Sequence, residues 1–173
     1  MDRIAFITAL ATIVTNTVGC DLSDLELPGF DELPLDGLTE LCPEALESGD
    51  PADCDGEYVG TIVLELMTSS NVPLAGCVGD AVVLIDSSAE TSVMGEGSCT
   101  FDGLLESLGE QDGWFEGDMA NEDPLQGELE LGDDIYAEWS GGYDADGAIV
   151  AGFEGSYDYQ GIEIRYQGIL ELD

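Results

Sequence analysis

Carboxylates are the side chains in this sequence that are most able to do chemistry. The 173 residues include 39 Asp and Glu, but only two Arg, no Lys and no His. The chain therefore lacks Ser-His-Asp and Cys-His arrangements, a His-Glu-x-x-His zinc site, a P-loop lysine and a Schiff-base lysine. Two carboxylates could still serve as the acid and base of a hydrolase. With so many acids no single pair stands out, so we expect no catalytic residues and a protein that is not an enzyme, with a carboxylate-based hydrolase as an alternative.

Two Asp-x-Asp-Gly segments, Asp53–Gly56 and Asp144–Gly147, are the best places to look for a metal. Calcium and other hard cations prefer carboxylate and carbonyl oxygens. Neither segment continues to the bidentate Glu of an EF-hand loop, and Asp-Gly is also a common hairpin turn. We therefore expect turns and no cofactor, with Asp144 and Asp146 as weak metal candidates.

The net charge of −37 limits the partners of the protein. Such a field repels phosphate backbones, so nucleic-acid binding is excluded. It also repels anionic membrane surfaces, so any membrane attachment must be covalent or hydrophobic. We interpret the charge mainly as a solvated surface that suits a salty environment, with cation binding on the acidic surface as the alternative.

The first 20 residues differ sharply from the rest. Arg3 precedes an apolar run, 4–14, that has secretory length and is too short to span a bilayer. Thr17-Val18-Gly19-Cys20 then resembles the lipobox of bacterial lipoproteins. This resemblance implies a signal peptide over 1–19, a fatty-acylated (palmitate-bearing) Cys20, export, and a lipid anchor in a bacterial envelope membrane whose leaflet stays open. The alternative is an ordinary secretory cut after Gly19 that leaves Cys20 as a free thiol.

The other cysteines, at 42, 54, 77 and 99, could form two disulfides in an oxidising compartment if Cys20 carries lipid. Four cysteines allow three connectivities. A symmetric hairpin with its turn near Ser88 sets Cys77 opposite Cys99, close enough for a disulfide, and Cys42 would then join Cys54 by exclusion. Buried reduced thiols are the alternative.

The elements that must position these residues are strands. Alternate residues from Tyr58 to Leu66, and again from Ile162 to Leu172, are large apolar residues or Gly, which is the pattern of half-buried antiparallel strands. Further strands are expected near 81–86, 92–101, 113–120, 125–131, 135–143 and 148–159, with turns over 121–124 and 144–147 and a short helix or loop at 104–108. Arg165 is expected to pair with a cross-strand carboxylate.

A weak repeat of a large apolar residue, any residue and then Gly runs through these strands, as in Phe115-Glu116-Gly117 and Phe153-Glu154-Gly155. Glycines beside inward aromatic rings suit a strongly coiled sheet in which the rings cover the gaps. We therefore predict an all-β fold, an antiparallel up-and-down meander closed into a small barrel of about eight strands. A β-sandwich or an open meander is the alternative.

The predicted organisation is a signal peptide (1–19), an acidic lipid-anchored spacer with a short helix over Pro43–Ser48 (20–56) and a β domain (57–173). The functional hypothesis is an exported lipoprotein with a non-enzymatic structural or binding role at the envelope and an unidentified protein partner. A second hypothesis, from a different functional class, is a small barrel that carries an apolar or aromatic ligand in its interior.

Overall fold

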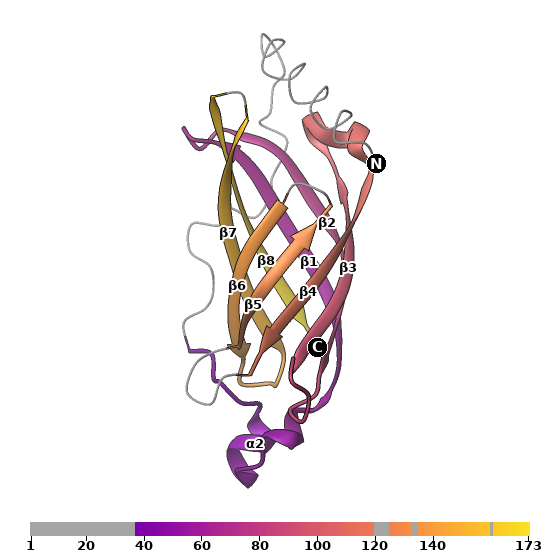
Figure 1. The fold of residues 1–173 in the computed structure, drawn as a ribbon, viewed down its shortest axis with the longest axis vertical. Coiled ribbons are helices and arrows are strands. Elements are labelled where there is room, and N and C mark those ends of the chain that lie inside the picture. The colour runs from indigo at the N-terminus through magenta and orange to yellow at the C-terminus, as the bar shows by residue number, and fades with distance from the viewer. Residues whose placement is uncertain (1–36, 120–124, 133–134, 160) are drawn as a thin grey trace.

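The computed structural model describes residues 37–119, 125–132, 135–159 and 161–173, and its centre is a closed antiparallel barrel (Figure 1). Each strand pairs with the next along the chain, and the first pairs with the last. The eight strands are β1 (Gly56–Thr68), β2 (Pro73–Ile85), β3 (Val93–Phe101), β4 (Glu110–Asp118), β5 (Leu125–Leu131), β6 (Ile135–Tyr143), β7 (Ile149–Tyr159) and β8 (Ile162–Leu172). The predicted up-and-down barrel is confirmed, and the sandwich and the open meander are not formed.

Alternation of side chains along each strand separates the interior from the outer surface. In β1, Ile62, Leu64 and Leu66 are buried while Val59 is exposed. β8 places Ile164, Tyr166, Leu170 and Leu172 inside in the same way. The inner faces that the sequence predicts for the first and last strands are therefore the observed ones.

Aromatic rings fill the places where inward glycines leave room. Trp139 lies directly opposite Gly127, Phe153 opposite Gly168, and Tyr166 opposite Gly155. A Cβ atom at Gly168 would collide with the Phe153 ring, and one at Gly155 would collide with Tyr166. The lumen is thus occupied by large side chains packed against bare backbone, which agrees with the pairing of rings and glycines expected from the repeat.

The β2–β3 hairpin has a different register from the predicted one. Ile85 pairs with Val93, so the turn is centred on residue 89, and Cys77 lies opposite Phe101 rather than opposite Cys99. The disulfide between Cys77 and Cys99 nevertheless forms, as a diagonal link with Cα atoms 5.4 Å apart. Moving the turn by one residue shifts the pairing by two, so both cysteines still face inward.

β2 begins at Pro73, well before the strand expected near 81–86. Its first half contains the small residues Gly76, Cys77 and Gly79. The alternation of large apolar side chains that indicates a strand is therefore not visible there in the sequence. Gly79 lies opposite Cys99, where a Cβ atom would be 2.6 Å from the Cys99 Cα. Glycine is therefore required there because two backbones approach closely beside the disulfide.

Short helices lie at both ends of the barrel, largely where the sequence predicts them. α2 (Pro43–Ser48) ends at Gly49, which has φ +79° and donates its N–H to the carbonyl of Ala45. It is followed by the 3₁₀ helix η2 (Pro51–Cys54), and η3 (Gly103–Leu108) fills the predicted helix or loop at 104–108. Asp102, just before η3, accepts the Gly76 N–H on its carboxylate at 2.9 Å.

Residues 37–55, which we call the end cap, close one end of the barrel (α2 in Figure 1). The disulfide between Cys42 and Cys54 joins α2 to η2, and both cysteines belong to the buried core. Thr39 exchanges two backbone hydrogen bonds with Tyr143 at the end of β6, at 2.8 and 2.9 Å. This part of the predicted spacer therefore packs on the barrel, and residues 20–36 lie outside the described residues.

Candidate functional site

A row of four glutamates crosses the outer surface of four neighbouring strands. Glu116 of β4 lies directly opposite Glu128 of β5, Glu128 opposite Glu138 of β6, and Glu138 opposite Glu154 of β7. Directly opposed residues have Cβ atoms about 5 Å apart, and like charges in such pairs destabilise a sheet. We call these four side chains the glutamate row.

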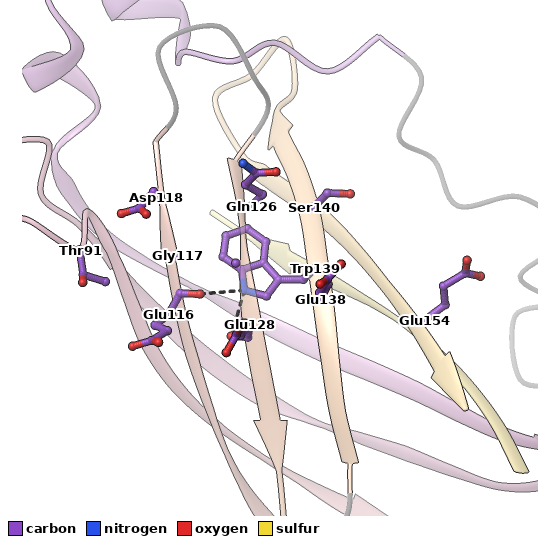
Figure 2. Close-up of a pocket in the computed structure, with 11 residues that line it drawn as sticks. Thr91, Glu116, Gly117, Asp118, Gln126, Glu128, Glu138, Trp139, Ser140 and Glu154 are labelled. Carbon is purple, nitrogen blue, oxygen red and sulfur yellow. Dashed lines mark hydrogen bonds between the residues drawn. The ribbon is translucent and has the colours of Figure 1, made fainter. Parts of the chain in front are cut away.

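The glutamate row borders a broad groove of about 640 Å³ (Figure 2). Its polar rim also includes Thr91, Asp118, Gln126 and Ser140. Figure 2 shows the four glutamates spread across neighbouring strands, with the Trp139 indole among them and overlapping the middle strand. The Trp139 side chain is buried, whereas Glu128, Glu138 and Glu154 are exposed. The groove is therefore an acidic depression on the sheet surface whose floor is backbone and one aromatic ring.

Trp139 fixes the backbone under the glutamate row. Its indole N–H donates to the carbonyl oxygens of Glu116, at 3.3 Å, and Glu128, at 3.2 Å. The side chain is only 5% exposed, and a Cβ atom at Gly117 would be 2.7 Å from its Cζ2 atom. One buried ring on β6 thus links to the backbone of β4 and β5 at two residues of the glutamate row.

A second groove, of about 330 Å³, adjoins the first on β4–β6. Trp114 lies opposite Glu130, and Glu130 lies opposite Tyr136. The Tyr136 hydroxyl donates to Glu130 Oε1 at 3.2 Å. Trp114 is 43% exposed and Tyr136 is 56% exposed, so both rings face solvent on either side of a carboxylate. We call these three residues the aromatic slot.

Burial perturbs the ionisation of groups elsewhere on the barrel. Burial raises the pKa of Glu65 on β1, and a hydrogen bond from Gln167 partly offsets this effect. The pKa values of Tyr58 and Tyr143, next to the end cap, are also raised chiefly by burial. The Tyr58 hydroxyl donates to the Cys54 carbonyl at 3.0 Å, which anchors the end cap to β1.

The weak metal candidates Asp144 and Asp146 lie in the β6–β7 turn. Asp144 Oδ1 accepts the N–H groups of Asp146 and Ala148, each at 2.9 Å, and Gly147 has φ +89°. In the other Asp-x-Asp-Gly segment, Asp55 Oδ1 accepts the Ser87 N–H at 2.7 Å. Both segments therefore act as turn or linking elements. Within the described part of the chain, no group of three or more Cys, Asp or Glu side chains is placed to hold a metal ion.

The other residues that the sequence singles out are the cysteines and Arg165. Cys42, Cys54, Cys77 and Cys99 form the two predicted disulfides, and Cys20 lies outside the described residues. Arg165 donates to the Asn71 side chain at 3.1 Å, and the residues directly opposite it are Met67 and Ser156. The expected cross-strand carboxylate partner of Arg165 is therefore wrong, because the register sets uncharged residues on both sides.

The sequence does not reveal the glutamate row or the aromatic slot as sites. Each member is an ordinary outward residue of its own strand, and only the register between strands aligns them. The outward Glu within the aromatic-Glu-Gly repeats at Glu116 and Glu154 is the one signal that could have suggested the row.

No described helix is both long enough and apolar enough to cross a membrane. Comparison with protein-family models, curated proteins and solved structures finds no match to this chain.

Proposed function

We propose that this protein is an exported, lipid-anchored binding protein of a bacterial envelope, and that it is not an enzyme. In this proposal Cys20 carries the lipid, and the barrel is a rigid scaffold whose outer β2–β7 face binds a partner. The lipobox-like Thr17–Cys20 segment supports the anchor. The two disulfides support export, because disulfides persist in oxidising compartments.

The large aromatic rings in the interior are the observation that carries the binding role of the outer face. Phe101, Phe115 and Tyr143 are each at most 2% exposed, and Trp139 and Phe153 cover glycines of neighbouring strands. Large rings remain exposed on the outside, where the aromatic slot lies beside the glutamate row. A partner would therefore find both apolar contact area and charge on the outer surface.

The absence of catalysis is part of the proposal. Acid–base hydrolysis needs two carboxylates in contrasting environments, so that one keeps its proton and the other does not. Glu128, Glu138 and Glu154 are all exposed on one open face, and Glu116 is half-buried beside them. None of the four is fully buried, and this open setting favours charge recognition over proton transfer.

Intact mass of the protein extracted from bacterial membranes tests the anchor. The wild-type chain is expected to begin at Cys20 and to carry acyl mass, whereas Cys20→Ser is expected to lack that mass and to leave the membrane fraction. Ser23→Ala is the matched control, since it changes a side chain near the lipid site and leaves every cysteine in place. A soluble wild-type protein without acyl mass would overturn the anchor.

The carrier hypothesis has a test of its own, since a closed barrel of eight strands can hold one small ligand. It requires the rings of Phe153 and Tyr166 to move away from Gly168 and Gly155. Titration with an apolar fluorescent dye is expected to give no saturable one-to-one binding. Stoichiometric binding that disappears in Gly155→Leu would replace the outer-face proposal with a carrier role.

A further inference from the structure

The aromatic slot has the parts of a site for a planar cation. Trp114 and Tyr136 lie on β4 and β6, with Glu130 of β5 directly between them. Neighbouring strands are about 4.8 Å apart, so the two ring-bearing backbones are separated by about 10 Å. The groove between them is about 330 Å³, and its floor is the backbone near Leu129 and Ala137.

The chemistry of the slot selects a guanidinium group. Aromatic faces attract cations, and a guanidinium group also stacks flat on them. A carboxylate accepts two parallel N–H bonds from the same group. The hydrogen bond from Tyr136 orients Glu130 but leaves acceptor capacity, because a carboxylate offers about four lone-pair sites. An ammonium group could use the charge but not the planar stacking.

Further carboxylates around the slot favour a cation. Glu96 of β3 lies opposite Trp114 on the side away from Glu130, and Glu128 and Glu138 line the same groove. Arg165 is on β8, where it donates to Asn71, so it does not neutralise this face. A field of one sign also speeds the encounter with an oppositely charged partner.

An apolar strip beside the slot indicates that the ligand is a polypeptide rather than a small cation. Leu84 of β2 and Met94 of β3 lie directly opposite each other, and they are 52% and 48% exposed. Met94 pairs with Glu116, and Trp114 is the next outward residue on β4, so the apolar strip and the slot are diagonal neighbours. A single arginine would leave this strip uncovered, whereas a peptide with apolar neighbours would cover it.

We propose that the outer face of β2–β6 binds a basic segment of a partner protein, with one arginine held between Trp114 and Tyr136 on Glu130 and apolar neighbours on Leu84 and Met94. This inference rests on the proposed binding role and names the class of partner. The predicted peptide binding does not depend on acylation of Cys20. Either prediction can therefore be contradicted by its own experiment without affecting the other.

Isothermal titration calorimetry of the full chain at fixed ionic strength tests the proposal. The probes are a short Leu-Arg-Leu peptide with blocked ends, the same peptide with citrulline in place of arginine, and N-acetylarginine amide. The arginine peptide is expected to bind at least tenfold more tightly than either of the others. Citrulline keeps the planar shape without the charge, and the amide lacks the apolar neighbours.

Four variants separate the slot from the general acidity of the protein. Trp114→Ala and Glu130→Gln are each expected to weaken binding of the arginine peptide by about tenfold, the order expected for one cation–π contact or one charge-assisted pair. Met94→Gln should reduce the advantage of the peptide over the amide. Glu171→Gln removes the same charge on β8 and should change affinity less than about twofold.

These variants are at exposed positions, and their melting curves show whether each one folds. Equal losses in Glu130→Gln and Glu171→Gln would overturn the slot in favour of nonspecific charge attraction. Wild-type affinity in Trp114→Ala, or equal binding of the citrulline peptide, would overturn the role of the rings and of the cation. The same peptide with lysine in place of arginine is a further probe, and binding as tight as that of the arginine peptide would contradict the planar selectivity.

Discussion

Glu128 occupies the middle of the glutamate row, so its neutralisation should stabilise the protein. It lies opposite a glutamate on each side, Glu116 on β4 and Glu138 on β6. At about 5 Å in water each repulsion is worth about 0.8 kcal/mol. Glu128→Gln keeps the size and the hydrogen-bonding groups of the side chain and removes both repulsions. At low ionic strength we therefore expect a gain of about 1.5 kcal/mol in the free energy of unfolding.

Salt distinguishes this electrostatic gain from any change in packing. The Debye length falls from about 30 Å at 0.01 M salt to about 3 Å at 1 M, which is shorter than the Cβ separation of about 5 Å between opposed residues. Most of the gain from Glu128→Gln should therefore disappear at high salt. The wild-type protein should itself become more stable as salt is added.

Urea unfolding at several salt concentrations measures this effect, because urea is uncharged and leaves the ionic strength unchanged. Glu171→Gln is the matched control, since Glu171 lies opposite the uncharged residues Thr61 and Val150. It removes one unit of the same net charge and should stabilise by less than half as much at low salt. Equal gains in the two variants, or a gain from Glu128→Gln that persists at 1 M salt, would refute local repulsion as the cause.

Three further changes test the packing and ionisation of the barrel. Trp139→Phe should lower the free energy of unfolding by about 2–3 kcal/mol, because two part-buried carbonyls lose the indole N–H and a void forms. Gly168→Ala should cost about 1–3 kcal/mol in urea unfolding because its Cβ would strike the Phe153 ring, whereas Gly56→Ala, with its nearest atom 3.9 Å away, should be nearly neutral. Glu65→Gln should stabilise the protein at neutral pH but not at about pH 3.5. The raised pKa means that the folded state resists ionisation, so wild-type stability falls as pH rises through the unfolded pKa of 4.5 towards the folded one.

Each of these expectations can be contradicted. Wild-type stability in Trp139→Phe would mean that water satisfies the two carbonyls. If Gly56→Ala destabilised the protein as much as Gly168→Ala, loss of backbone freedom rather than the ring contact would be responsible. An equal gain from Glu65→Gln at both pH values would show that burial of the charge is not the cause.

The fold was largely predictable because its strands follow local rules. The alternation from Tyr58 to Leu66 and from Ile162 to Leu172 needs only a half-buried sheet, and glycines beside aromatic residues point to strong coiling. The first half of β2 was missed because Gly76 and Gly79 interrupt the apolar alternation. The small size of Gly79 serves the close approach of two backbones, which cannot be seen in one strand alone.

The site was much less predictable because it depends on how strands align. A turn centred one residue later than expected moved the partner of Cys77 from Cys99 to Phe101 while keeping the inward faces. Such shifts leave core predictions intact but change every neighbour on the surface. The alignment of Glu116 with Glu128, and of Trp114 with Tyr136 across Glu130, could therefore be obtained only from the three-dimensional register.

Closure of the barrel between β1 and β8 has a consequence for how the chain folds. The pairing of Gly60 with Leu172 joins the two ends of the β domain, so this seam must wait until the intervening strands have formed or collapsed. Until then β1 and β8 present two unpaired edges that could join strands of other molecules. All copies carry the same negative charge, which opposes such contacts. The acidity that destabilises the folded barrel would therefore protect the partly folded protein from aggregation.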